Sequence, residues 1–118
     1  MKEKVIVLGA SPKPERYAHK AQTLLTQFGH QVLPVNPAFE TIEGVPCFKR
    51  LEDVPGPVDT ITLYLGPPRS EPLIESIIAK KPKRVIMNPG TESQLLQERL
   101  ASAGILPRTH GSGMFERG

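Results

Sequence analysis

Short apolar runs alternate along the chain with segments that have helical spacing. The runs are rich in Val, Ile and Leu, and they predict five strands, at residues 4–8, 30–35, 60–65, 84–87 and 105–106. Between them, apolar residues at three- and four-residue intervals predict helices at residues 15–28 and 71–80, and a further helix follows the fourth strand. Strands that alternate with helices form a parallel sheet covered on both faces. The pattern therefore predicts an α/β fold, a three-layer sandwich with a mainly parallel five-stranded sheet.

The ends of the predicted helices carry residues typical of helix boundaries. Gly29 and Gly104 follow the first and the last helix, and glycine commonly ends a helix because it adopts the left-handed conformation without strain. Thr91 and Gln94 have the spacing of a capping box, in which two side chains satisfy backbone N–H groups at the helix start. This spacing predicts that the last helix begins near Glu92.

Glycines and prolines interrupt the connection at residues 37–57, so no long regular helix is expected there. Within it, residues 45–48 are predicted to form a short extended piece, and residues 51–54 a single helical turn. The sequence Gly66-Pro67-Pro68 ends the third strand, and the helix after it is predicted to begin only at Glu71.

The composition is that of one compact domain. The chain has 118 residues, of which 38% are hydrophobic and 23% charged, enough to bury a core without disulfides or a structural metal. Cys47 is the single cysteine, so no intrachain disulfide and no multi-cysteine metal motif can form, and the three histidines lack metal-ligand spacing. We expect a domain at residues 4–107, an irregular C-terminal tail at residues 108–118, and no bound metal.

Charge and hydropathy limit the partners of the chain. No apolar run approaches the roughly 20 residues that span a bilayer, and the charged residues Lys2, Glu3 and Lys4 stand where a secretory signal would be apolar. A cytoplasmic location without a membrane partner is expected. The formal net charge of +3 suits an anionic ligand, but Lys and Arg are not clustered with aromatic residues, so no nucleic-acid partner is expected.

The start of the chain carries the motif that points to a ligand. The strand at residues 4–8 enters a helix through the tight turn Gly9-Ala10-Ser11, and the second strand ends in Asn36-Pro37. This order is the first half of a dinucleotide-binding, Rossmann-like fold, in which the turn and the helix N-terminus bind a pyrophosphate. Lys13 and Arg16 lie at the helix start, where cations are unfavourable unless an anion is bound nearby. The alternatives are a turn that binds nothing and surface cations that face only water.

The end of the second strand discriminates among nucleotide cofactors. NAD-dependent proteins usually have Asp or Glu at this place to hold the ribose hydroxyls, whereas this chain has Val35-Asn36-Pro37. The turn also lacks the second and third glycines of G-x-G-x-x-G. A neutral strand end tolerates a phosphorylated ribose, so NADP or coenzyme A fits better than NAD.

Ligands of such sheets bind at the carboxyl ends of the strands, near the point where the strand order reverses. No catalytic residue is predicted, because the nucleophile-elbow pattern G-x-S-x-G is absent and His110 has no assignable base partner. The residues predicted to bind a cofactor lie in turns at this edge or at the start of the first helix: Gly9, Ala10, Ser11, Lys13, Arg16, Tyr17, Asn36, Pro37, Tyr64, Leu65, Asn88, Pro89 and Gly90.

Three motifs together carry a family resemblance. They are V-x-G-A-S-x-K-P-x-R, V-x-P-V-N-P and G-V-P-C-F-K-R-L-E-D-V-P-x-P-V-D, within residues 4–104. This combination resembles the small, stand-alone CoA-binding proteins, which are similar to the CoA-binding domain of the succinyl-CoA synthetase α subunit. The resemblance implies a CoA-binding Rossmann-like domain whose cofactor is coenzyme A or an acyl-CoA.

The resemblance also implies a role for each part of the site. The Gly9-Ala10-Ser11 turn would meet the pyrophosphate, Lys13 and Arg16 would neutralise phosphates, and Asn36-Pro37 would border the adenosine. Tyr64-Leu65 and Asn88-Pro89-Gly90 would line the remainder of the cleft.

The chain departs from the family pattern in two places. Thr109-His110-Gly111 replaces an Asp-Arg-Cys motif, and Leu65-Gly66-Pro67-Pro68-Arg69 replaces an aromatic residue followed by Arg. Both departures fall where the pantetheine arm or an acyl group would lie.

Three hypotheses of function follow from these features. The first is a non-catalytic single-domain module that binds coenzyme A, alone or with a protein partner. The second is a subunit of an NADP- or CoA-dependent enzyme whose catalytic residues come from a partner. The third is an interaction protein whose cleft binds no nucleotide.

Overall fold

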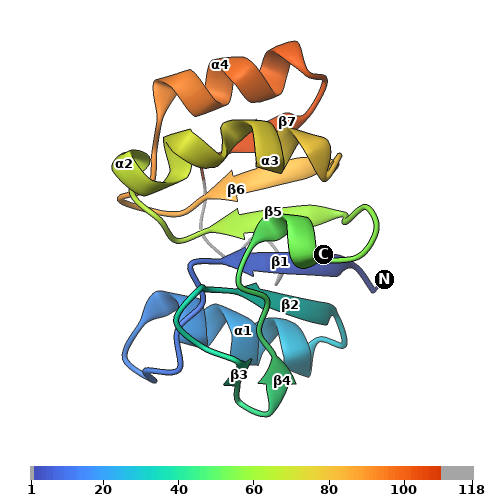
Figure 1. Ribbon diagram of the computed structural model, residues 1–118, viewed down its shortest axis with the longest axis vertical. Helices are drawn as coiled ribbons and strands as arrows, with labels where there is room; N and C mark the ends of the chain where they lie inside the picture. The colour runs from blue at the N-terminus through green and yellow to red at the C-terminus, as the bar shows by residue number, and fades with distance from the viewer. Residues whose placement is uncertain (1, 110–118) are drawn as a thin grey trace.

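Five parallel strands form the central sheet of the computed structural model, which describes residues 2–109 (Figure 1). In chain order they are β1 (Lys4–Leu8), β2 (Gln31–Val35), β5 (Thr60–Leu63), β6 (Arg84–Met87) and β7 (Leu106–Arg108). Across the sheet the order is β2-β1-β5-β6-β7, and all neighbouring strands are parallel. The chain reverses its direction across the sheet between β1 and β5, and such sheets bind ligands at this switch point. The predicted α/β, Rossmann-like sandwich is confirmed.

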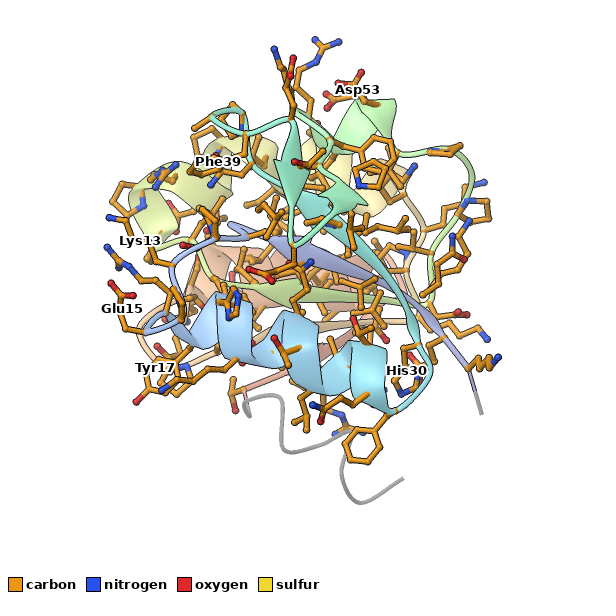
Figure 2. The ribbon with its side chains drawn as sticks, turned by 90° about the horizontal axis from the view of Figure 1, so that it is seen from below. Lys13, Glu15, Tyr17, His30, Phe39 and Asp53 are labelled. Carbon is orange, nitrogen blue, oxygen red and sulfur yellow. The ribbon has the colours of Figure 1, made fainter. Side chains whose placement is uncertain are left out.

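Helices cover both faces of the sheet. They are α1 (Tyr17–Gln27), the 3-10 helix η1 (Leu51–Asp53), α2 (Pro67–Ser70), the 3-10 helix η2 (Glu71–Leu73), α3 (Ile74–Ala79) and α4 (Gln94–Ser102). The face that holds Val5 and Val7 packs against α1, and the face that holds Ile6 and Leu8 packs against η1, α3 and α4. Figure 2 shows α1 on one side of the sheet and η1, marked by Asp53, on the other. Within the described residues, no helix combines the length and the apolar character needed to cross a membrane.

β1 is buried on both faces of the sheet. Val5, Ile6 and Val7 are fully buried, and Leu8 is 2% exposed. Successive side chains of a strand point to opposite faces, so this one strand supplies apolar side chains to both layers of helices. The buried strand therefore fixes the position of Gly9, the residue that follows it.

The connection between β2 and β5 contains an antiparallel hairpin that the apolar pattern does not reveal. Its strands are β3 (Thr41–Ile42) and β4 (Val45–Pro46), and Glu43 and Gly44 form the turn with φ angles of 53° and 75°. Positive φ at both central residues is the geometry of tight hairpin turns. The extended piece predicted at residues 45–48 contains β4.

The helical segment after β5 begins at Pro67, so the predicted start at Glu71 is wrong. Proline is favoured at the first helical position because that position needs no N–H donor. Gly66 is the N-cap, and η2 and α3 continue the segment to Ala79. As a result, Arg69 lies on a helix at the edge of the sheet rather than in a loop.

The capping box predicted for the last helix is also wrong. α4 begins after Ser93, not near Glu92, and Ser93 Oγ accepts a hydrogen bond from the Leu96 N–H at 3.1 Å. Thr91 Oγ1 instead donates to the Asn88 carbonyl at 2.7 Å, within the turn that follows β6. Ser and Thr are both good N-caps, so the sequence is compatible with a helix start at either residue. Ser93 is the N-cap because the Thr91 hydroxyl is already bonded within the turn after β6.

Two other element ends differ slightly from the predictions. α1 begins at Tyr17 rather than at residue 15, and β7 extends to Arg108, which the sequence analysis assigns to the tail. The remainder of the predicted tail from His110 onward, residues 110–118, lies outside the described residues. The domain boundary therefore remains a prediction.

Asp59 precedes β5 and joins the amino ends of neighbouring strands. Its Oδ2 accepts a hydrogen bond from the Lys4 N–H at 2.8 Å, and its Oδ1 lies 3.3 Å from the Lys83 ammonium. The hydrogen bond from the Lys4 backbone, with a smaller contribution from Lys83, lowers the pKa of this carboxyl group below its usual value. A carboxylate whose pKa is lowered on folding stabilises the protein above its ordinary pKa. That stability is lost as the pH falls through the lowered pKa.

Asp59→Asn should therefore reduce the acid sensitivity of the fold. We expect the free energy of unfolding of the wild type to decrease as the pH falls below about 4, and to decrease less steeply in the variant. Urea unfolding at a series of pH values measures both slopes. Asp53→Asn is the control, because the Asp53 carboxylate forms an exposed ion pair with Arg50. Equal slopes in the wild type and Asp59→Asn would contradict the assignment.

Candidate functional site

Backbone hydrogen bonds assemble the carboxyl ends of three strands into one rim. The N–H groups of Gly9 and Ala10 both donate to the Val35 carbonyl, at 3.0 and 3.2 Å, and the Tyr64 N–H donates to the Leu8 carbonyl at 2.8 Å. Gly9 has a φ of 91°, which is strained for any residue with a side chain. The turn after β1 is therefore joined to the end of β2 on one side and to the end of β5 on the other.

A two-lobed cleft opens at this rim. One lobe, the apolar lobe, has a volume of about 310 Å³ and is lined by Leu8, Gly9, Val35, Asn36, Pro37, Lys49, Arg50, Leu51, Glu52, Leu65, Arg69 and Leu73. The other, the basic lobe, has a volume of about 450 Å³ and is lined by Gly9, Ala10, Ser11, Lys13, Arg16, Tyr17, Ala18, Asn36, Phe39, Tyr64, Leu65, Arg69, Pro89 and Thr91. The two lobes adjoin, because both are lined by Gly9, Asn36, Leu65 and Arg69.

The basic lobe lies at the N-terminus of α1. Figure 2 shows Lys13 and Tyr17 at this end of the helix, with Phe39 at the same end of the molecule. Lys13, Arg16 and Arg69 line the lobe, and no acidic residue does. The first turn of α1 also lacks an acidic residue, and its N-cap, Arg16, makes no side-chain capping hydrogen bond. The helix dipole and three cations thus act together to make this lobe attractive to an anion.

Ser11 contributes both to the turn and to the lobe. Its Oγ accepts a hydrogen bond from the Lys13 N–H at 3.1 Å, so the hydroxyl supports the local backbone. A hydroxyl oxygen that accepts a hydrogen bond still carries a proton that it can donate. Ser11 can therefore support the turn and donate to an anion at the same time.

Asn36 holds the two lobes together. Its Nδ2 donates to the Ala10 carbonyl at 2.8 Å, its Oδ1 accepts from the Ala38 N–H at 2.8 Å, and its backbone N–H donates to the Phe48 carbonyl at 2.9 Å. Both ends of the side-chain amide are thus engaged by the protein. The neutral residue at the end of β2 connects the Gly9 turn to the β2–β5 connection.

The cleft brings together most of the predicted site residues. Those that line it are Gly9, Ala10, Ser11, Lys13, Arg16, Tyr17, Asn36, Pro37, Tyr64, Leu65 and Pro89. Asn88 and Gly90 do not. Asn88 is 3% exposed, and its Nδ2 donates to Thr62 Oγ1 and to the Leu63 carbonyl, both at 2.8 Å. Its amide therefore ties β6 to β5 and supports the rim from below.

Several cleft residues escape the sequence analysis. Arg69 and Leu73 enter the cleft because the helical segment begins at Pro67, and a proline at the first helical position is the signal that would have placed them. Lys49 and Arg50 reach the apolar lobe through a bridge between Phe48 and Val35. No local pattern predicts that long-range bridge.

Cys47 is packed behind the rim, and its surroundings do not activate its thiol. Cys47 is 9% exposed, and burial raises the pKa of its thiol, which disfavours the reactive thiolate. Its Sγ lies 3.6 Å from the Asn36 carbonyl, where it packs behind the rim. Among residues 2–109, no group of three or more His, Cys, Asp and Glu side chains is placed to hold a metal ion.

Residues 3–116 match the model of the CoA binding domain family. The chain belongs to this family. The predicted resemblance is confirmed, and the match spans nearly the whole chain.

Three individual comparisons extend the family assignment. The uncharacterized protein YneT of Bacillus subtilis (strain 168) is 30% identical over 62 residues, which are 52% of this chain and 46% of YneT, less than half of that relative. The structure of cell-free ID.343 from Thermus thermophilus has 29% sequence identity and a TM-score of 0.90, over 98% of this chain and 88% of that one. A hypothetical protein from Pyrococcus horikoshii OT3 has 27% sequence identity and a TM-score of 0.90, over 99% of this chain and 85% of that one.

The fold of this chain also occurs inside a larger protein. The apo form of the dinucleotide forming acetyl-coenzyme A synthetase 1 of Ca. Korarchaeum cryptofilum matches with a TM-score of 0.75 and 21% identity. The match covers 88% of this chain but only 25% of the synthetase. The same fold thus stands nearly alone in some proteins and forms about a quarter of another.

Proposed function

We propose that this chain is a non-catalytic, single-domain module whose cleft binds coenzyme A or an acyl-CoA. The observation that carries the proposal is the adjoining pair of lobes, one basic and one apolar, at the switch point of the sheet. Coenzyme A has the matching chemistry, because a pyrophosphate joins its adenosine to the pantetheine arm. Membership of the CoA-binding family supports the same ligand.

The pyrophosphate is assigned to the basic lobe. Its charge would be met by Lys13, Arg16 and Arg69 and by the N-terminal end of α1. Charge-assisted hydrogen bonds from arginine to phosphate are among the stronger polar contacts in proteins. Ser11 would add a neutral donor at the same turn.

The adenosine is assigned to the apolar lobe. Leu51, Leu65 and Leu73 give this lobe an apolar lining that suits the faces of a purine ring, and Pro37 lies at the end of β2 beside them. Gly9 and Leu65 both line the place where the two lobes meet. The missing side chain at Gly9 lets Leu65 pack against the turn, because a Cβ built on Gly9 would lie 2.9 Å from Leu65 Cδ2.

The alternative is a subunit of an NADP- or CoA-dependent enzyme whose catalytic residues come from a partner. Tyr17 favours it, because this tyrosine lines the basic lobe and is 78% exposed. Large exposed aromatic residues are enriched in protein interfaces. A partner that covered Tyr17 would also close the basic lobe.

Calorimetric titration with coenzyme A, acetyl-CoA, NAD and NADP tests the proposal, using protein shown by mass spectrometry to carry no retained ligand. We expect binding of coenzyme A and a rise in melting temperature, since a ligand at about 100 times its Kd adds about 2.7 kcal/mol of stability. NADP binding without CoA binding would favour the enzyme subunit. Failure of all four ligands to bind would overturn both assignments.

A further inference from the structure

Two cations, Lys49 and Arg50, line the apolar lobe without belonging to the turn after β1 or to the end of β2. They follow β4 in the connection between β2 and β5. An apolar lobe suits the purine ring, but it gives no reason for two adjacent cations. Their placement points to a negative charge on the part of the ligand that occupies this lobe.

The backbone places these cations beside the end of β2. Phe48 forms a parallel bridge with Val35, its N–H donates to the Pro34 carbonyl at 2.9 Å, and its carbonyl accepts from the Asn36 N–H at 2.9 Å. The chain therefore leaves β2 and later returns alongside it. In dinucleotide-binding folds, the end of the second strand is where the ribose of the adenosine is recognised.

The chain immediately after β2 has no charge with which to recognise the ribose. Asn36, Pro37, Ala38 and Phe39 are all neutral, and both ends of the Asn36 amide are already hydrogen-bonded to the backbone. Lys49 and Arg50 are the cations closest in the chain to the bridge that runs alongside this segment. We therefore expect Lys49 and Arg50, and not the end of β2, to make the polar contacts with the ribose.

The existing partners of the two cations leave them able to bind an anion. Lys49 makes no ion pair within residues 2–109. Arg50 lies 3.5 Å from Asp53, but both side chains are exposed, at 71% and 43%, and such pairs contribute little to stability. Glu52, the acidic residue that lines this lobe, accepts a hydrogen bond from Ser76 of α3 at 2.9 Å.

We propose that Lys49 and Arg50 recognise a phosphomonoester on the ribose of the bound adenosine nucleotide. This inference rests on the proposed function, since it requires the adenosine to lie in the apolar lobe. The chemistry is shared by the 3′-phosphate of coenzyme A and the 2′-phosphate of NADP. The two positive charges should raise the affinity for the ligand that carries this phosphate. They should not change the affinity for the same ligand without the phosphate.

The test compares ligands that differ by this phosphate alone. The wild type, the double variant Lys49→Ala/Arg50→Ala and a control double variant are titrated by calorimetry with coenzyme A, dephospho-CoA, NADP and NAD. We expect the wild type to bind coenzyme A about tenfold more tightly than dephospho-CoA, and the double variant to bind the two equally. Affinity for dephospho-CoA should not change.

The control is Lys83→Ala/Arg99→Ala, which removes the same charge from positions outside the cleft. Lys83 precedes β6 at the opposite edge of the sheet, and Arg99 lies on α4. The control should keep the full preference for coenzyme A, because its effect on the ligand is only long-range and screened by salt.

The outcomes separate the assignment of Lys49 and Arg50 from the proposal that the cleft binds coenzyme A. A preference for the phosphorylated ligand that survives in Lys49→Ala/Arg50→Ala would overturn this assignment and leave the CoA proposal standing. If the wild type bound coenzyme A and dephospho-CoA equally, and NADP and NAD equally, the assignment would also be overturned. A preference seen only between NADP and NAD, and lost in the double variant, would support the phosphomonoester site and overturn the choice of coenzyme A. If none of the four ligands bound, both proposals would fall.

Discussion

Arg16→Glu is expected to weaken coenzyme A binding by about a hundredfold, equivalent to about 2.7 kcal/mol. Arg16 is the N-cap residue of α1 and lines the basic lobe together with Lys13 and Arg69. Reversing its charge replaces an attraction to the proposed pyrophosphate with a repulsion at the same place. Calorimetric titration of the wild type and the variant measures the change in Kd.

The same substitution should not destabilise the ligand-free protein. A carboxylate at the start of a helix interacts favourably with the helix dipole by about 0.3–1 kcal/mol, and a guanidinium interacts unfavourably. The melting temperature of ligand-free Arg16→Glu is therefore expected to stay the same or to rise, while its affinity falls. This opposition separates a ligand contact from a damaged fold.

Lys20→Glu is the matched control for this experiment. It makes the same change in charge one turn further along α1, at a residue that lines neither lobe. We expect its effect on Kd to be less than about threefold, because exposed charges at this distance are screened by water and salt. Similar losses in both variants would mean that only the net charge of the surface matters, and the assignment of Arg16 would fail.

Gly9→Ala is expected to lower the free energy of unfolding by about 2–4 kcal/mol. Gly9 has a φ of 91°, and a Cβ added there would lie 2.9 Å from Leu65 Cδ2 and 3.2 Å from the carbonyl carbon of Tyr64. The leucine side chain can move, but the Tyr64 backbone is held by its hydrogen bond to the Leu8 carbonyl. The strain must therefore be relieved by a shift of the rim, and ligand affinity should fall as well.

Gly90→Ala separates the two causes of this loss. Gly90 has a φ of 89°, almost the same as Gly9, but nothing lies within 4 Å of a Cβ added there. Its loss should be limited to the cost of the left-handed conformation, about 1–2 kcal/mol. Urea unfolding of both variants gives the difference, which reports the close contact at Gly9. Equal losses would show that the backbone conformation alone accounts for the effect and that the rim has space at Gly9.

Most of the sheet could be predicted from the sequence because β1, β2, β5 and β6 contain local apolar runs, whereas the edge strand β7, Leu106–Arg108, is not one. The long runs around β1 and β5 have the composition of strands buried on both faces, and the glycines after α1 and α4 have the conformations of helix ends. The hairpin of β3 and β4 could not be predicted, because two-residue strands carry no alternation. The helix start at Pro67 could not be predicted for a different reason, because proline can either break a helix or begin one.

The cleft divides in the same way. The predicted residues that line it directly follow β1, β2, β5 or β6, or begin α1, and parallel topology brings the carboxyl ends of strands to one edge. Lys49 and Arg50 depend on a bridge between residues that are distant in the sequence. Asn88 follows β6 as predicted, yet its side chain turns inward to hydrogen-bond β5. Position along the chain predicts the edge on which a residue lies but not the direction of its side chain.

The residues shared by both lobes come from three separate segments of the chain, which contain Gly9, Asn36, and Leu65 with Arg69. No continuous fragment contains the whole cleft. A chain that is partly folded, or cut between these segments, therefore lacks the complete binding site. Any ligand bound there therefore adds its free energy only to complete molecules. Proteases that attack the transiently opened chain would meet fewer targets as ligand accumulates. The resistance of the protein to proteolysis would then rise with the concentration of the ligand.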